Sequence, residues 1–251
     1  MSSNNDARFN PYRLSTTGRC CPVLSKVRLG LLLLVLTLYA GYGYTSTEVV
    51  PIDANLPKRP LIEALPITIG VYYSPEFSTH ESIEEVEGDR DRYKFNLGSE
   101  SVALFDQVFA SMFEKVIPVD NRPPLRTDGP KVNAVIEPRI EYLRIGVVTQ
   151  SQNVDEHCWV RISYYITLYS PDGGSIALFR VDAVGESRPG YSIGVKSFGE
   201  AMHFAMRDAA AQVMTGFSDE PAVREWLQAL GVVSSVISPK WSERLSATGQ
   251  E

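Results

Sequence analysis

The sequence predicts an α+β fold, a two-layer sandwich in which a mostly antiparallel sheet carries two main helices on one face. Residues 99–116 and 198–217 repeat apolar side chains with the period of a helix. Between them, residues 132–149, 158–169 and 176–185 alternate in the manner of strands, and the turn Ser-Pro-Asp-Gly-Gly-Ser joins the last two. Helices that flank a strand meander in this order pack on one face of the sheet.

The first predicted element is a strand. Residues 67–74 form an apolar, β-branched and aromatic run that Pro75 ends, which is typical of a strand buried on both faces. The next segment, from Glu76 to Asp91, is acidic and predicts a solvated loop, with a contact surface for a basic partner as a second interpretation. It lacks the ligand pattern of an EF-hand calcium loop. Residues 92–98 then lead as a short strand into the first helix.

The helix over 99–116 is the clearest element of the sequence. Either Ser99 or Ser101 is expected to cap its start. Its predicted inner stripe follows i, i+3, i+4 and i+7 spacing and consists of Val102, Phe105, Val108, Phe109, Met112, Phe113 and Val116. A loop over 118–131 follows.

Two features mark the strand over 132–149. Its alternating apolar residues occupy even positions up to Tyr142 and odd positions from Leu143 onward, which predicts a bulge or bend near Tyr142. Pro138 lacks the backbone donor that a central strand needs, so it indicates an edge position or a bulge.

The strand over 158–169 carries the candidate partner site. One face holds Val160, Ile162, Tyr164, Ile166 and Leu168. The other face carries Trp159, Tyr165 and Tyr169. Two interpretations remain open for this aromatic set: cover by loops or by the C-terminal segment around Trp226 and Trp241, or exposure as a binding face.

Two helices and a tail close the chain. The helix over 198–217 has the predicted inner stripe Phe198, Met202, Ala205, Ala209, Val213 and Phe217. A short helix follows over 220–230, with Asp219 as its cap, Pro221 in its first turn and Gly231 at its end. Residues 232–251 are expected to form a flexible tail.

The N-terminal part predicts export across a membrane. Residues 1–28 carry five basic groups and one acidic group, residues 29–44 are apolar and uncharged, and the next charges are Glu48 and Asp53. The positive-inside bias therefore places 1–28 in the cytosol. Residues 45–66 contain four prolines and predict an extended tether to a periplasmic domain over 67–231. The predicted anchor residues are Leu29, Leu31, Leu32, Leu33, Leu34, Val35, Leu36 and Leu38.

The fate of the apolar segment stays open at this stage. Sixteen residues of helix span about 24 Å, short of a hydrocarbon core of about 30 Å. One interpretation is an uncleaved anchor in the inner membrane, and another is a signal sequence cleaved near Ala40 and Gly41. A bacterial lipidation signal would need cysteine where Tyr42 stands.

Composition narrows the class of protein. The chain carries a net charge of −6 and residues 1–44 carry +4, so residues 45–251 carry −10. An acidic domain of this kind argues against nucleic-acid binding. Cys158 is the only cysteine after the apolar segment, so no disulfide can form within the exported part. The sequence has no Asn-x-Ser/Thr site, which favours a bacterial envelope protein.

Three possible catalytic or metal motifs do not support an enzyme. Ser192 lies in Gly-Tyr-Ser-Ile-Gly, but only His203 follows it, too soon to build a hydrolase site. His157 and Cys158 are neighbours in a strand and therefore point to opposite faces. His80 has no partner at metal-ligand spacing. No catalytic residue, metal or cofactor is expected.

Four segments carry a resemblance to a known family: PITIGVYYSPEF, SVALFDQVFASMFEKV, YYITLYSPDGGSI and AMRDAAAQVM. Their order and texture resemble the YajG-like family of small Gram-negative envelope lipoproteins and, more distantly, the lipopolysaccharide-assembly lipoprotein. The resemblance implies no catalytic residues. The chain departs from it at Tyr42, where such proteins carry a lipidated cysteine.

The sequence therefore predicts a non-enzymatic envelope protein with an accessory or assembly role. Its partner would be another envelope protein or a transport or assembly complex, recognised through the sheet face or an edge strand. The alternative is a carrier or sensor of a small apolar ligand, held in a pocket lined by Phe105, Phe109, Met112 and Phe113.

Overall fold

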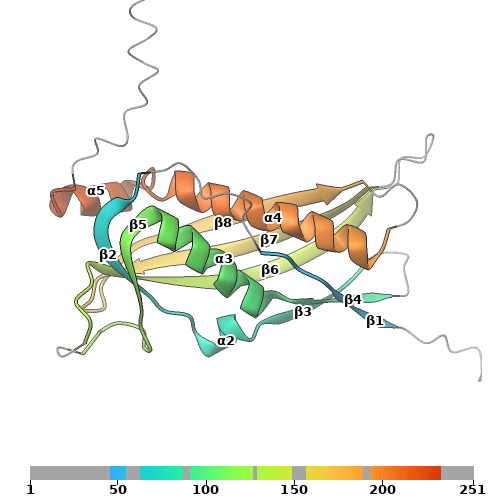
Figure 1. Ribbon diagram of the computed structural model, residues 1–251, viewed down its shortest axis with the longest axis horizontal. Coiled ribbons are helices and arrows are strands. Elements are labelled where there is room, and N and C mark those ends of the chain that lie inside the picture. The colour runs from blue at the N-terminus through green and yellow to red at the C-terminus, as the bar shows by residue number, and fades with distance from the viewer. Residues whose placement is uncertain are drawn as a thin grey trace, which may run out of the picture. The chain divides into compact units, whose positions relative to one another are not determined.

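The computed structural model describes residues 46–54, 63–86, 91–126, 129–148, 157–188 and 193–232 (Figure 1). The described elements are, in chain order, β1 (Thr47–Val50), β2 (Leu65–Val71), α2 (Pro75–Ser78), β3 (Glu81–Glu85), β4 (Arg92–Asn96), α3 (Leu97–Met112), β5 (Phe113–Pro118), β6 (Ala134–Val148), β7 (His157–Tyr169), β8 (Ser175–Ser187), α4 (Val195–Gly216) and α5 (Pro221–Ala229).

These strands form two sheets. The larger has the order β5-β2-β6-β7-β8, in which β2 runs parallel to both neighbours and β6, β7 and β8 form an antiparallel meander. The smaller has the order β1-β4-β3, with β1 parallel and β3 antiparallel to β4. The predicted α+β class is confirmed, with the difference that both sheets are mixed.

The core lies between the large sheet and the two long helices. Figure 1 shows α3 and α4 side by side over one face of β6, β7 and β8. The Phe105 ring of α3 packs edge-on against Tyr164 of β7, with ring centroids 5.1 Å apart. The buried Tyr164 hydroxyl lies 3.0 Å from the Ser101 hydroxyl. Burial raises the pKa of Tyr164.

The segment expected to be an extended tether contributes a strand to the domain. β1 pairs with β4, and Val50 and Ala54 are buried. The Pro51 carbonyl lies so close to Gly199 of α4 that an added Cβ would sit 2.7 Å from its oxygen. A four-residue strand has too short an alternation to be recognised, and its partner lies more than forty residues away.

The acidic segment expected to be a loop contains α2 and β3. The Ser74 hydroxyl caps α2 by accepting a hydrogen bond from the Phe77 N–H at 3.1 Å, and Pro75 occupies the first turn. β3 pairs with β4, where Lys94 and Glu81 form an ion pair at 2.8 Å. Cross-strand charge pairs of this kind allow a strand with little apolar content.

The helix predicted to end at residue 116 stops earlier. α3 ends at Met112, and Phe113 starts β5 without an intervening loop. The β-branched residues Val116 and Ile117 pair with β2 instead of continuing the helix. At the other end the helix begins at Leu97, and neither predicted serine caps it.

The predicted irregularities of β6 are confirmed. The register with β7 shifts between Ile140 and Tyr142, which leaves Glu141 as the extra residue of a bulge. The pairing of β2 with β6 ends at Ile136 in the ladder. Pro138 therefore lies where β6 has become an edge strand within the described part of the sheet.

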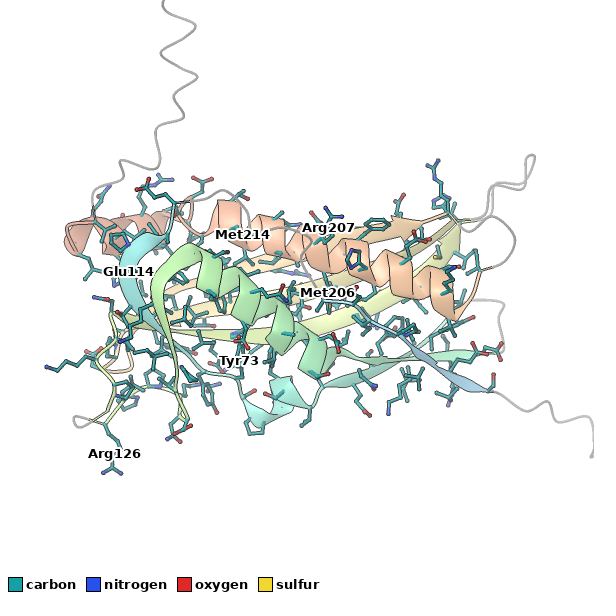
Figure 2. The ribbon with its side chains drawn as sticks, in the orientation of Figure 1. Tyr73, Glu114, Arg126, Met206, Arg207 and Met214 are labelled. Atoms are coloured by element: carbon teal, nitrogen blue, oxygen red, sulfur yellow. The ribbon has the colours of Figure 1, made fainter. Side chains whose placement is uncertain are left out.

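Helix α4 contacts both its neighbouring helix and the edge of the sheet. The predicted stripe from Phe198 to Val213 is buried. The Ser111 hydroxyl of α3 contacts the Met214 sulfur of α4 at 3.7 Å (Figure 2). At the sheet edge, Asp208 accepts a hydrogen bond from the Val184 N–H at 3.1 Å, and Gln212 donates to the Asp182 carbonyl at 2.8 Å. Helix α5 follows, with Glu220 rather than Asp219 at its cap position.

Candidate functional site

The candidate site is the face of β6, β7 and β8 opposite the two long helices, here called the outer face. Residues paired across three strands form rows on it. One row holds Gly146, Trp159 and Glu186, and another holds Arg139, Tyr165 and Arg180. The remaining rows are Arg144–Arg161–Val184, Tyr142–Ser163–Asp182 and Glu137–Thr167–Leu178.

The three aromatic residues predicted for a partner site all lie on the outer face and are half-buried. Trp159 lies flat against Gly146, where an added Cβ would sit 2.4 Å from the ring. The exposed Arg161 guanidinium lies 6.0 Å from the centroid of the Trp159 ring. Along the strand, Tyr165 lies about 20 Å from Trp159, so the aromatic residues are not one cluster. Charged side chains fill the space between them.

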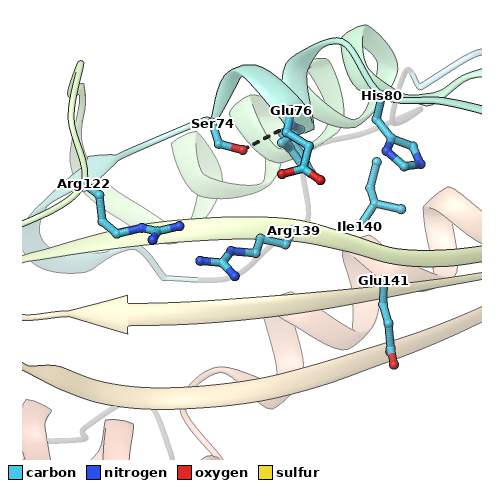
Figure 3. A pocket seen from close by; sticks show the side chains of 8 residues that line it. Ser74, Glu76, His80, Arg122, Arg139, Ile140 and Glu141 are labelled. Atoms are coloured by element: carbon cyan, nitrogen blue, oxygen red, sulfur yellow. Dashed lines mark hydrogen bonds between the residues drawn. The ribbon is translucent and has the colours of Figure 1, made fainter.

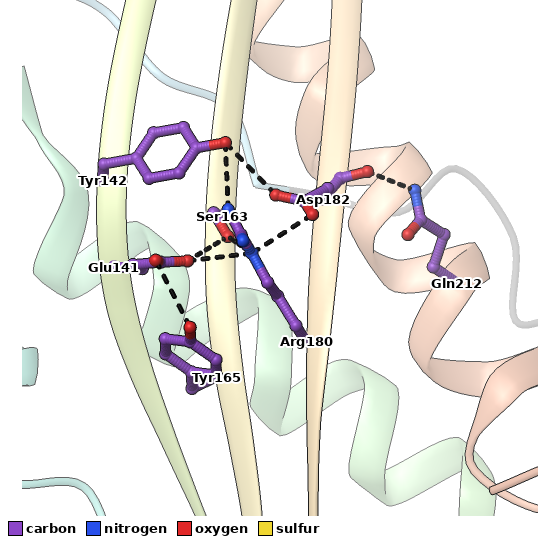
Figure 4. Close-up of polar contacts among 7 residues, drawn as sticks. All are labelled: Glu141, Tyr142, Ser163, Tyr165, Arg180, Asp182 and Gln212. Carbon is purple, nitrogen blue, oxygen red and sulfur yellow. Dashed lines mark hydrogen bonds and ion pairs between the residues drawn. The ribbon is translucent and has the colours of Figure 1, made fainter.

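The bulge in β6 builds the centre of the outer face. Because Glu141 is the extra residue, it and Tyr142 both face the same row as Ser163 (Figure 4). The Ser163 hydroxyl donates to Glu141 Oε2 at 2.8 Å. The Arg180 Nε lies 2.9 Å from the same carboxylate oxygen and 3.2 Å from Asp182 Oδ2.

The Arg180 side chain is also held between two aromatic rings. Its guanidinium carbon lies 5.5 Å from the Tyr142 centroid and 6.0 Å from the Tyr165 centroid. The Tyr142 hydroxyl donates to Asp182 at 3.3 Å, and the Tyr165 hydroxyl donates to Glu141 at 3.4 Å. Desolvation opposes the charge of Arg180, but the two carboxylates outweigh it and raise its pKa. Arginine stacked on aromatic rings and fixed by carboxylates is pre-organised for contact.

The other end of the outer face is covered by the loop after β5. The Leu125 N–H donates to the Pro171 carbonyl at 2.8 Å. Arg122 of the same loop pairs with Glu137, whose side chain is fully buried. Arg139 lies 3.3 Å from the same carboxylate oxygen. The loop after β5 thus packs against the end of the outer face where Tyr169 is located.

The Glu137 carboxylate is held in its ionised form. Burial by itself raises the pKa of Glu137, but hydrogen bonds from Arg122 and Arg139 outweigh burial and lower it. The bond to Glu137 also raises the pKa of Arg122, although desolvation opposes this.

A cleft of about 490 Å³ opens beside these arginines, between α2 and β6 (Figure 3). It lies beyond the point where the pairing of β2 with β6 ends. Its lining residues are Ser74, Glu76, Phe77, His80, Arg122, Arg139, Ile140 and Glu141.

The candidate catalytic and metal residues do not come together. Cys158 is buried on the inner face, where desolvation raises its pKa to about 11, and His157 lies on the outer face. His203 Nδ1 lies 2.9 Å from the Asp53 carbonyl oxygen. Ser192 lies outside the described residues. Within the described ranges, no group of three or more His, Cys, Asp or Glu side chains is arranged to hold a metal ion.

The four residues expected to line an apolar pocket are packed in the core. Phe105 and Phe109 stack at 5.4 Å, and Phe113 packs edge-on against Phe217 at 5.3 Å. Met112 is buried with them. None of the four lines the cleft described above or the one formed by the loop between Pro118 and Pro130.

The predicted membrane anchor, residues 29–44, lies outside the described residues. No helix in the described part of the chain is both long and apolar enough to cross a bilayer.

No protein-family model and no curated protein sequence matches the chain. Several solved structures resemble it at low identity, among them the following three. A neuraminyllactose-binding hemagglutinin homologue from Helicobacter pylori shares 10% identity at a TM-score of 0.44, over 73% of this chain and 100% of that one. A minor lipoprotein from Acinetobacter baumannii shares 7% at a TM-score of 0.37, over 62% and 94%. A lipoprotein from Caulobacter crescentus shares 11% at a TM-score of 0.32, over 52% and 84%.

Two of these three structures are described as lipoproteins. Neither the YajG-like family nor the lipopolysaccharide-assembly lipoprotein is among the three.

Sequence reasoning missed the charged residues of the outer face. Arg180 and Asp182 occupy outward positions of a predicted strand, and this alternation could have identified them as surface residues. Their contact with Glu141 depends on the cross-strand register and on the bulge. The pair of Arg122 and Glu137 depends on a loop whose path the sequence does not specify.

Proposed function

We propose that the chain is a non-enzymatic protein of the bacterial cell envelope that binds a protein partner through the outer face. The observation that carries this proposal is the pair of arginine–aromatic stacks on that face. Arg161 lies over Trp159, and Arg180 lies between two tyrosines. Tryptophan, tyrosine and arginine are the residues most enriched at the energetic centres of protein interfaces.

Stability alone gives a weak reason for this arrangement. Exposed ion pairs typically contribute about 0–1 kcal/mol, yet Arg180 is fixed by two carboxylates and a serine hydroxyl. Both long helices lie on the opposite face, so the stacked arginines remain accessible among the described residues (Figure 1). Leu178 and Val184, exposed by 58% and 37%, add apolar area to the same face.

The location of the domain follows from the N-terminal charge asymmetry. Basic residues before the apolar segment and acidic residues after it favour export to the periplasm. The partner is accordingly another envelope protein or a subunit of a transport or assembly complex. The mature mass of a C-terminally tagged chain, together with its membrane fraction, distinguishes an inner-membrane anchor from a released periplasmic protein.

The partner proposal is tested by photo-crosslinking of the full chain in a Gram-negative host. A photoreactive phenylalanine derivative replaces Tyr165 on the outer face or, as a matched control, Phe204 on α4. Phe204 is exposed by 39% and lies on the helical layer. We expect a discrete crosslinked species from position 165 that is lost when Arg161→Glu reverses the charge beside Trp159.

Crosslinks of equal yield from position 204 would contradict the proposal. So would a species from position 165 that persists unchanged in the Arg161→Glu variant, because contact would then not involve the stack of Arg161 on Trp159, one of the two stacks that carry the proposal.

A further inference from the structure

The cleft between α2 and β6 contains a buried ion cluster that the binding proposed for the outer face does not use. Glu137 is fully buried at an outward-facing strand position, and two arginines converge on it. Burying a carboxylate costs several kcal/mol before its partners compensate, and an apolar residue of similar volume is often as stable. The buried ion cluster is therefore poorly explained by stability alone.

The cluster leaves one positive charge uncompensated. One carboxylate faces two guanidinium groups, and Glu137 takes few of the ten N–H donors that the two arginines carry together. Both side chains remain about half exposed, at 46% for Arg122 and 48% for Arg139. Figure 3 shows the two guanidinium groups directed toward each other along β6.

The acidic residues of the cleft do not neutralise this pair. Glu141 points away from the arginines and is bound to Ser163 and Arg180 (Figures 3 and 4). Glu76 extends from α2 on the opposite wall into the cleft (Figure 3), but among the described residues the ion pairs of Arg122 and Arg139 go to Glu137 and not to Glu76. The excess positive charge thus lies at the Arg122 end.

We infer that this cleft binds an oxyanion, a carboxylate or a phosphate group, between the Arg122 and Arg139 guanidiniums. Planar guanidinium groups bind such groups through paired, charge-assisted hydrogen bonds. Glu137 is the positioning residue, because its buried carboxylate pairs with both guanidiniums and fixes them at the wall of the cleft. The site does not depend on the partner proposed for the outer face.

The test is a titration of the full chain labelled with ¹⁵N-arginine, in which the side-chain Nε–H resonances report each guanidinium. Sodium phosphate and sodium acetate are the two probes, each at constant ionic strength maintained with chloride. We expect saturable shifts at Arg122 and Arg139, and no saturable shift at Arg207, an exposed arginine on α4 (Figure 2). Saturation by phosphate alone identifies a phosphate site, and saturation by both probes identifies a general oxyanion site.

Variants make the result specific. Arg139→Gln is expected to weaken binding at least tenfold, whereas Arg207→Gln changes it less than twofold. Arg122→Gln alone would leave the buried Glu137 carboxylate without one of its two arginine partners. The double variant R122Q/E137Q, which removes both charges, therefore serves as the second test. It is expected to fold and to lose binding to the same extent. Shifts that do not saturate, or that occur equally at Arg207, would overturn the inference.

Discussion

The inner and outer faces of β6, β7 and β8 are made by alternate residues of the same three strands, but different interactions organise them. On the inner face, side chains such as Val160 and Ile162 are fully buried beneath α3 and α4. On the outer face, arginines are fixed by carboxylates and rings at defined distances. Apolar burial is non-directional and supplies most of the stability, whereas polar contacts are directional and fix side-chain position. One sheet therefore separates apolar packing on its inner face from a directional polar array on its outer face.

The largest difference between the two faces is expected when one methyl group is added to each. Gly185 lies under α4, and its added Cβ would come within 1.9 Å of the Ala201 carbonyl oxygen and 2.3 Å of the Ala205 nitrogen. Because both are backbone atoms of a packed helix, Gly185→Ala is expected to cost more than about 3 kcal/mol or to prevent folding. Urea unfolding measures the loss.

The matched change on the outer face is Gly146→Ala. Its Cβ would meet the Trp159 ring, a side chain that can turn away. The expected cost in free energy of unfolding is about 1 kcal/mol or less, below the usual cost of overpacking a core, and it is accompanied by a change in tryptophan fluorescence. Equal losses for the two variants would mean that both faces contribute equally to stability.

The second prediction concerns Glu137, the one outer-face charge that is buried like a core residue. Its pKa is lowered because bonds from two arginines outweigh desolvation, so the folded state favours the ionised form. Its contribution is complete above the ordinary value of 4.5 and is lost as the pH falls through the lowered pKa. Glu137→Gln is expected to cost about 1–3 kcal/mol at pH 7.

The difference between wild type and Glu137→Gln is expected to shrink as the pH falls below about 4.5. Unfolding curves at pH 7, 5, 4 and 3 follow this difference. A difference that stays constant over this range would mean that the carboxylate contributes through its shape and not through its charge.

The smallest effect is expected at Arg180. Its ion pairs lie on a partly exposed surface, so Arg180→Gln is expected to lower the free energy of unfolding by less than either Gly185→Ala or Glu137→Gln does. Arg207→Gln on α4 is the control and is expected to have no effect. A loss for Arg180→Gln as large as that for Gly185→Ala would show that the outer face stabilises the sheet as the inner face does.

Prediction from sequence succeeded where one period governs a long segment. The meander and α4 follow their periods for more than ten residues each, and the phase switch beside Tyr142 revealed the bulge. Prediction failed where residues fit both the helical and the strand period, and where a segment is too short to show any period. Phe113 and Val116 continue the helical spacing of α3, but tertiary pairing with β2 takes them into β5. β3 has a single large apolar residue, Ile83, and is stabilised by its pairing with β4.

From the sequence, the candidate site could be predicted only as one face of a strand, and not as a set of contacts. Alternation along β7 places Trp159, Tyr165 and Tyr169 together on one side of the sheet, as the sequence indicates. Arg161 stacks on Trp159 within β7, whereas Arg180 reaches the rings of Tyr165 and Tyr142 from β8, so the contacts of Arg180 depend on inter-strand register. Register is set by the whole sheet, so a local pattern cannot specify it.

The contact of α4 with β8 also bears on self-association. β8 is an edge strand, and an edge strand with free backbone groups is a template for pairing with another molecule. In the middle of β8, the Val184 N–H and the Asp182 carbonyl are already bound by Asp208 and Gln212. With α4 in place, a foreign strand cannot continue the ladder through this stretch. The same helix that covers the core thus protects the protein against edge-to-edge polymerisation.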